Sequence, residues 1–315
     1  MYLRHFSLRE APFSITPDSA FFYSHDGAQA ALNMLLVALR SGEGFLKIVG
    51  EVGCGKTVLC RQLLKTLQGE CVTAYIPNPD MGPDDLLQAL MQEFGLDVSL
   101  RRGRRPSKRQ APNRYELLNT LRDCLLKHAE TGRPVVVCID EAQAIPLATL
   151  ESLRLLSNLE TEKRKLLQLV LLGQPELDVK LSRPEIRQLL QRITFSEYLG
   201  PMRAPCVPTY LAHRLATAAL NDATDTQVFE LAAAQLMARL SGGVPRLLNI
   251  LAHKCLMLAY GENMHRVNRQ HVQLAGADTP GVRALAPVSW LSRWLPWKSR
   301  RLAQNIQNDQ QGAAL

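Results

Sequence analysis

Short apolar runs alternate with longer segments of helical period over the first 200 residues of the chain. Most of the runs end at a glycine, a proline or an acidic residue, which is typical of strands buried in a sheet. The expected strands are residues 45–49, 71–76, 135–139, 166–172 and 193–198. The expected helices between them are residues 57–67, 86–94, 115–128 and 147–159. Strands that alternate with helices predict a parallel sheet with helices on both faces.

The pattern changes after Pro201, because no strand candidate of comparable strength follows it. Apolar residues spaced three or four apart predict helices over residues 207–220, 228–240, 246–260 and 268–275. We therefore expect an α/β domain over residues 1–200 and a small all-α lid domain over residues 201–278. Residues 279–315 hold three tryptophans, three prolines and a polar end, and we expect them to form a separate tail.

Residues 50–57 read Gly-Glu-Val-Gly-Cys-Gly-Lys-Thr and lie between an expected strand and an expected helix. This run fits G-x-x-x-x-G-K-[ST], the phosphate-binding P-loop or Walker A motif. Glycines let the loop turn its N–H groups toward phosphate oxygens, and the helix that follows adds the positive end of its dipole. We expect Lys56 to contact the β- and γ-phosphates and Thr57 to bind Mg²⁺. The predicted nucleotide contacts in this loop are Gly50, Glu51, Val52, Gly53, Cys54, Gly55, Lys56, Thr57 and Val58.

Two acidic residues, Asp140 and Glu141, come directly after the expected strand 135–139. In a parallel sheet they would lie at the same edge as the P-loop, as a Walker B motif does. Asp140 could then hold Mg²⁺ together with Thr57, and Glu141 could activate a water for attack on the γ-phosphate. Acids also follow strands simply as helix N-caps, and the P-loop upstream favours the catalytic interpretation.

Composition limits the class of protein. The 315 residues are 46% hydrophobic and carry 37 Lys and Arg against 29 Asp and Glu, a net charge of +8, which excludes a mainly disordered or collagen-like chain. Seven scattered cysteines without a C-x-x-C pair argue against structural zinc and disulfides. The sequence has neither a run of about 18 apolar residues nor an apolar signal core. We therefore expect a cytoplasmic protein, or one on the cytoplasmic face of a membrane.

The positive charge is concentrated in two segments that hold no acid, residues 101–114 and 283–301. The first, within an expected basic loop at 99–114, could bind nucleic acid, acidic lipid or an assembly partner, or could be a solvated loop. It contains no aromatic residue for base stacking, which makes nucleic acid the less favoured partner. The second holds Trp290, Trp294 and Trp297 at helical spacing among arginines, which suits peripheral contact with the inner membrane. A partner-docking segment or a flexible end is the alternative there.

Several motifs together resemble the AAA+ ATPases. These are Ile-Asp-Glu-Ala-Gln at 139–143, the aromatic opening at 1–23, Gly-Glu-Gly-Phe at 42–45, Leu-Gly-Gln-Pro-Glu-Leu at 172–177 and Gly-Gly-Val-Pro-Arg at 242–246. More narrowly, the chain is similar to the ExeA/general secretion pathway protein A family and within it to MshM-like ATPases of MSHA pilus biogenesis. Relatives of the ExeA type continue into a transmembrane segment and a periplasmic domain. Because this sequence stops earlier, we expect the non-spanning, MshM-like branch.

The resemblance implies roles for four further positions. Gln174 matches the polar sensor at the end of the fourth strand, although a strand-end cap is equally compatible. Arg192 matches the arginine finger that reaches a neighbouring subunit, and Arg187 is the second candidate for that finger. Arg246 matches a second sensor carried by the lid, where a cation at a helix start is unfavourable unless an anion binds it. The aromatic opening would lie near the adenine or would pack into a core.

The sequence therefore predicts a homo-oligomeric, Mg²⁺-dependent ATPase that assists assembly of a pilus or secretion machine at the inner membrane. The cofactors expected are ATP and Mg²⁺, and the expected partners are further copies of the chain and the machine's own proteins. A DNA-associated AAA+ ATPase of the transposition type is the main alternative, since it would explain the basic run at 101–114. A nucleotide-gated scaffold with little turnover is a third possibility.

Overall fold

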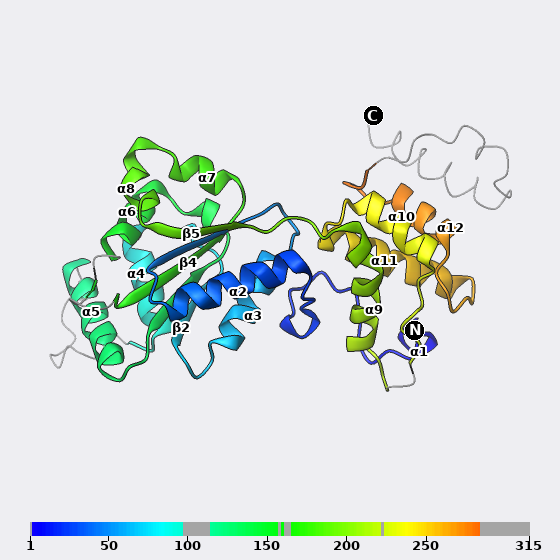
Figure 1. The fold of residues 1–315 in the computed structure, drawn as a ribbon, viewed down its shortest axis with the longest axis horizontal. Helices are drawn as coiled ribbons and strands as arrows, with labels where there is room; N and C mark the ends of the chain where they lie inside the picture. Colours follow the sequence, from blue (N-terminus) through cyan, green and yellow to red (C-terminus); the bar gives the residue numbers. More distant parts are fainter. Residues whose placement is uncertain (1, 97–113, 157–158, 161–164, 222–223, 284–315) are drawn as a thin grey trace, which may run out of the picture.

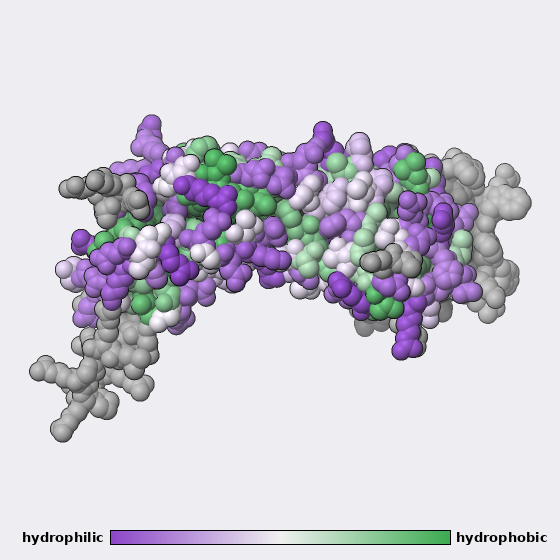
Figure 2. Space-filling view, turned by 60° about the horizontal axis from the view of Figure 1, so that its bottom comes forward, coloured by the Kyte–Doolittle hydropathy of each residue, from purple (hydrophilic) through white to green (hydrophobic). Residues whose placement is uncertain are grey.

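The chain folds into an α/β domain and a helical domain that lie side by side along the long axis of the molecule (Figure 1). The computed structural model describes residues 2–96, 114–156, 159–160, 165–221 and 224–283. Residues 99–113 of the expected basic loop and the tail residues 284–315, with all three tryptophans, lie outside the described residues. Figure 2, seen from another direction, shows that the molecular surface is continuous across the junction of the two domains.

Five parallel strands form one sheet in the α/β domain. They are β1 (Phe45–Val49), β2 (Val72–Ile76), β3 (Val135–Ile139), β4 (Leu167–Gly173) and β5 (Ile193–Tyr198), in the order β2-β3-β4-β1-β5. All neighbours pair in parallel, and Val49 at the end of β1 lies opposite Gly173 at the end of β4. Because all strands run the same way, the segments that follow β1, β3 and β4 meet at one edge of the sheet.

Helices cover both faces of this sheet. One face carries α2 (Asp26–Arg40) and α3 (Lys56–Thr66), whose apolar residues share a core with Leu46 and Ile48 of β1. The other face carries the helices α4 (Pro83–Glu93), α5 (Arg114–Glu130), α6 (Leu147–Leu156), α7 (Glu176–Leu181) and α8 (Arg187–Leu190). The predicted fold class, a P-loop α/β domain with a flanked parallel sheet, is confirmed.

The sequence analysis missed one long helix, α2. Its buried residues are spaced three or four apart, as an amphipathic helix requires, and are Ala28, Ala31, Leu32, Leu35, Ala38 and Leu39. Three of these six buried residues are leucine and three are alanine, so the pattern was present in the sequence. The helix covers the sheet face next to α3, as Figure 1 shows.

The helical domain consists of α9 (Val207–Thr217), α10 (Leu231–Ser241), α11 (Pro245–Gly261) and α12 (Arg269–Ala277). Short 3-10 turns occur elsewhere in the described chain at Ser19–Phe21, Ala142–Ala144, Pro184–Ile186 and Ala204–Cys206. Leu248, Leu251 and Leu256 of α11 are fully buried against α10 and α12. The domain therefore has a hydrophobic core of its own.

The amino-terminal segment belongs to this second core, which corrects the assignment of residues 1–200 to the α/β domain. Phe6, Leu8, Phe13 and Phe21 are buried among residues of α9, α10 and α11, and α1 (Tyr2–His5) lies beside them (Figure 1). Two backbone hydrogen bonds join the segment to the end of α9: Arg9 donates one through its N–H, and Ser7 accepts the other through its carbonyl oxygen. The physical reason is that α2 and α3 already cover the adjacent sheet face, so the aromatic side chains are buried in the other domain.

A tight turn at Gly243 leads into α11 at the junction of the two domains. Gly243 has φ +80°, and a Cβ added there would lie 2.0 Å from the carbonyl oxygen of Met202. The backbone N–H of Met202 donates to the Gly243 carbonyl at 2.9 Å. The segment that leaves the sheet after β5 is thus held directly against the turn before α11.

We expect Gly243→Ala to destabilise the protein, because a side chain there combines positive φ with a backbone clash. The cost should be about 1–3 kcal/mol or more, seen as a thermal unfolding midpoint lowered by several degrees. Gly261→Ala is the matched control, since a Cβ at Gly261 in α11 meets nothing within 4 Å. That control should keep or raise the midpoint. Equal midpoints for the two variants would contradict this account of the turn.

Candidate active site

The P-loop begins where β1 ends and leads into α3, as the sequence predicts. Lys56, the first residue of α3, is buried, and its Nζ donates to the carbonyl oxygens of Gly50 at 2.7 Å and Glu51 at 3.1 Å. Gly53, with φ +82°, has no room for a side chain, because an added Cβ would lie 2.7 Å from the Cβ of Arg246. A buried ammonium held by loop carbonyls is placed to exchange those partners for phosphate oxygens.

Asp140 lies beside this loop at the end of β3 and is almost fully buried. Its Oδ2 accepts hydrogen bonds from the Thr57 hydroxyl at 2.6 Å and the Tyr75 hydroxyl at 3.3 Å, and its Oδ1 accepts from the backbone N–H of Glu141 at 2.9 Å. A hydroxyl and a carboxylate joined in this way are donors of the kind Mg²⁺ takes when it also binds nucleotide phosphates. Thr57 and Asp140 therefore fit the metal that the sequence predicts.

Tyr75, on β2, is a site residue that the sequence analysis missed. Burial, and then the negative charge of Asp140, raise the pKa of its hydroxyl. The hydroxyl therefore stays protonated and remains a donor to Asp140 at any physiological pH. An isolated tyrosine in a strand gives no local signal of this role, since only the pairing of β2 with β3 brings the two side chains together.

Glu141 follows Asp140 in a left-handed backbone conformation, with φ +49°. Its Oε2 accepts hydrogen bonds from two side-chain amides, that of Gln143 at 2.6 Å and that of Gln174 at 3.2 Å. Gln174 comes directly after β4, so the ends of β3 and β4 meet at this carboxylate. The side chain of Gln174 contacts Glu141 and lines the cavity described next.

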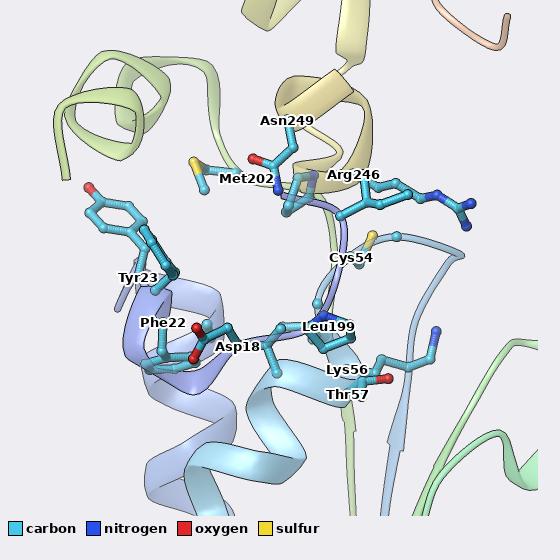
Figure 3. Close-up of a pocket in the computed structure, with 18 of the residues that line it drawn as sticks. Asp18, Phe22, Tyr23, Cys54, Lys56, Thr57, Leu199, Met202, Arg246 and Asn249 are labelled. Atoms are coloured by element: carbon cyan, nitrogen blue, oxygen red, sulfur yellow. The ribbon is translucent and has the colours of Figure 1, made fainter. Parts of the chain in front are cut away.

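A cavity of about 350 Å³ lies over the P-loop, between the two domains. Figure 3 shows Lys56 and Thr57 at one end of it and Phe22 and Tyr23 at the other, with Arg246 above the P-loop. The cavity receives residues from the amino-terminal segment, the start of α2, the carboxyl edge of the sheet, α9 and the start of α11. A cavity of this size at such an edge is the usual position for a ligand in an open α/β sheet.

Arg246 joins the helical domain to the P-loop. Its backbone N–H donates to the carbonyl of Gly53 at 3.2 Å, and its side chain lines the cavity (Figure 3). Pro245 occupies the first turn of α11, so the positive end of this helix dipole also lies near the loop. The helical domain thus contributes a cation and a helix start to the same cavity that the P-loop lines.

The amino-terminal segment forms the other end of the cavity and is held by Arg214 of α9. The buried Arg214 guanidinium donates to the carbonyls of Pro12 at 2.6 Å and Ser14 at 3.2 Å and lies over the ring of Phe21, 4.5 Å from its centre. Phe21, Phe22 and Tyr23 all line the cavity, and Phe21 is also buried in the core of the helical domain. Core packing of the aromatic opening is thus confirmed for Phe21, and the contact with adenine stays a prediction. Arg214 is a second residue that the sequence analysis missed.

Cys54 of the P-loop is also buried, and burial raises the pKa of its thiol. A higher pKa lowers the fraction of reactive thiolate. This environment supports packing as the role of Cys54.

Arg192 and Arg187 lie away from this cavity. Arg192 comes directly before β5 and lines a hollow at the amino edge of the sheet with Gly44, Lys165 and Thr194. The P-loop lies at the opposite, carboxyl edge, so Arg192 does not reach the phosphate site of its own chain. Arg187 is exposed at the start of α8.

Comparison with known proteins agrees with this geometry. Residues 39–181 match a family described as an AAA domain. The chain is 40% identical over 283 residues to general secretion pathway protein A of Aeromonas hydrophila. The aligned residues make up 90% of this chain and 49% of that protein. The chain therefore spans about half the length of this curated relative.

Solved structures share the fold. The ORC2 protein of Aeropyrum pernix has a TM-score of 0.59 at 18% identity, over 89% of this chain and 75% of that one. Cdc6p of Pyrobaculum aerophilum has a TM-score of 0.62 at 17% identity, over 82% and 70%. The RuvB branch-migration motor of Thermotoga maritima has a TM-score of 0.51 at 18% identity, over 80% and 68%. At these identities the likeness concerns the fold alone.

Among the described residues, every helix is too short or too polar to cross a bilayer. The matched domain contains the P-loop, Asp140 and Glu141, and the similarity to the secretion protein extends from there across most of the chain. Residues 39–181 form a domain of the AAA family of P-loop ATPases, and the chain as a whole is similar to general secretion pathway protein A.

Proposed function

We propose that this chain hydrolyses ATP in the cavity between its two domains and that turnover drives assembly or transport by a secretion or pilus machine. The observation that supports hydrolysis most directly is the grouping at the end of β3. There Thr57 and Asp140 are joined at 2.6 Å, and Glu141 presents a second carboxylate that the pair does not use. One carboxylate is needed for the metal and another for the attacking water.

Lys56 and the P-loop bind the triphosphate. When phosphate enters, the Lys56 ammonium exchanges the carbonyls of Gly50 and Glu51 for β- and γ-phosphate oxygens, which are stronger acceptors. Backbone N–H groups of the loop and the start of α3 add to the positive field. Mg²⁺, when bound, would be held by Thr57 and Asp140 and would reduce the negative charge of the phosphate oxygens.

Glu141 acts on the attacking water. Its carboxylate accepts a proton as the water oxygen bonds to the γ-phosphorus, and the bond to the β-phosphate oxygen breaks so that ADP leaves with the electron pair. The amide of Gln174 lies on the same carboxylate and faces the cavity, so it can contact the water or the γ-phosphate. Arg246 adds a cation from the helical domain to the same space.

Two substitutions should separate binding from chemistry. Lys56→Ala should abolish ATP binding, because it removes the buried ammonium from the phosphate site. Glu141→Gln should bind ATP as the unaltered protein does but lower kcat by about 10²–10⁴, because it removes the base. Nucleotide affinity by fluorescence titration and phosphate release measure the two effects.

Lys65→Ala, at an exposed position of α3, and Glu185→Gln, at an exposed position before α8, are the matched controls. Both should bind and hydrolyse ATP normally. If Lys56→Ala kept its affinity and its phosphate release, the proposed function would be wrong. Unchanged turnover in Glu141→Gln would reject the role of that residue alone and would favour a different base.

The secretion or pilus role rests on the 40% identity to general secretion pathway protein A. The chain covers about half the length of that protein. We place the protein in the cytoplasm, as a homo-oligomer, and peripherally at the inner membrane through residues 283–301, of which the structure describes only Arg283. The MshM-like branch is part of the same proposal. Turnover stimulated by anionic vesicles or pilus-assembly proteins would support it. The DNA-associated alternative requires DNA-stimulated turnover that falls steeply with salt.

Arg192 is proposed as an arginine finger that acts on the site of a neighbouring copy. The support is its position at the amino edge of the sheet, where it lies outside its own phosphate site. Arg192→Ala subunits should lose about 10³-fold in kcat but keep their ATP affinity. Mixed with Glu141→Gln subunits they should regain turnover, because an intact base then faces an intact finger. If the mixture hydrolysed ATP no faster than either variant alone, Arg192 would not be the arginine finger. The same series with Arg187→Ala tests the second candidate for the finger.

A further inference from the structure

The side-chain amide of Gln143 bridges two parts of the active site. Its Nε2 donates to Oε2 of Glu141 at 2.6 Å, and its Oε1 accepts the backbone N–H of Gln174 at 3.0 Å. The side chain of Gln174 in turn donates to the same Oε2 of Glu141 at 3.2 Å. Glu141, Gln143 and Gln174 therefore form a closed ring of hydrogen bonds between the end of β3 and the end of β4.

The backbone around Gln143 is also fixed. Gln143 lies in the 3-10 turn Ala142–Ala144, and the Lys180 ammonium of α7 donates to the carbonyls of Gln143 at 2.5 Å and Ile145 at 2.8 Å. Ala142, on the other side of Gln143, is fully buried in the core. A side chain whose backbone is held on both sides can hold its own partner in one position.

Gln143 does not line the cavity, whereas Glu141 and Gln174 do. It is therefore placed to act on the nucleotide only through those two residues. The two amide donors occupy Oε2 of Glu141, so the carboxylate has one defined orientation and Oε1 is the oxygen left to accept a proton from water.

We infer that Gln143 is a positioning residue that orients the Glu141 carboxylate for catalysis and couples it to the backbone of Gln174. This inference rests on the proposed hydrolysis of ATP. Its physical basis is that misplacement of a base by about 1 Å can cost about 10²-fold in rate. A displacement of Gln174, caused by a phosphate group in the cavity, would move Glu141 through the same ring of hydrogen bonds.

Removal of the bridge should lower the rate of chemistry without changing binding. In the full chain, Gln143→Ala should reduce kcat for ATP by about 10-fold to 100-fold and leave KM, ADP affinity and the thermal midpoint unchanged. Gln92→Ala, at an exposed position of α4, is the matched control and should behave like the unaltered protein. A merely structural role for Gln143 would instead lower the midpoint or weaken binding together with kcat.

Gln143→Glu gives a second test, because it keeps the acceptor for Gln174 but replaces the amide donor with a carboxyl group. The introduced carboxylate and that of Glu141 carry like charges and repel each other. Gln143→Glu should therefore lower kcat at least as far as Gln143→Ala and leave ADP affinity unchanged.

The outcomes distinguish this inference from the proposed function. If the unaltered protein hydrolyses ATP and Lys56→Ala does not, but Gln143→Ala has a normal kcat, only the role of Gln143 is overturned. The same holds if Gln143→Ala lowers affinity or stability in proportion to rate, or if Gln143→Glu keeps a normal kcat. If the unaltered protein shows no Lys56-dependent hydrolysis, the proposed function fails and this inference fails with it.

Discussion

The contact between the P-loop and the start of α11 is the interaction on which the site depends. The backbone N–H of Arg246 donates to the carbonyl of Gly53, and neither Gly53 nor Gly243 leaves room for a side chain at this junction. Without this close approach, the P-loop would be a phosphate loop on an open sheet edge. With it, the cavity has a second wall that carries Arg246 and belongs to a domain with its own core.

The parallel sheet and the amino-terminal segment supply the remaining walls. The sheet brings the ends of β1, β3 and β4 to one edge, which places Lys56, Asp140, Glu141 and Gln174 together although they are distant in sequence. The amino-terminal segment is held to α9 by Arg214 and yet lines the cavity with Phe22 and Tyr23. A ligand in this cavity would therefore contact both domains at once, which provides a direct route from nucleotide state to domain arrangement.

The sequence predicted the elements whose signals are local. The strands at 45–49, 135–139 and 193–198 were predicted to the residue, and the P-loop and the pair Asp140–Glu141 lie where their motifs placed them. Tyr75, Gln143 as a positioning residue and Arg214 were not found. Each contacts a partner beyond another strand or in the other domain, and strand pairing and helix packing create such contacts without leaving a pattern in the surrounding residues. The amino-terminal segment was assigned to the wrong domain for the same reason. Its aromatic composition indicates that it is buried, but does not indicate which domain it packs against.

Hydrogen exchange of backbone amides, measured with and without ADP and Mg²⁺, tests the two-domain site most directly. The account predicts that nucleotide slows exchange both in the P-loop, residues 50–57, and at the start of α11, residues 244–250, because the ligand contacts and orders both walls of the cavity. Slowed exchange in the P-loop with no change at the start of α11 would contradict it, since the helical domain would then take no part in binding.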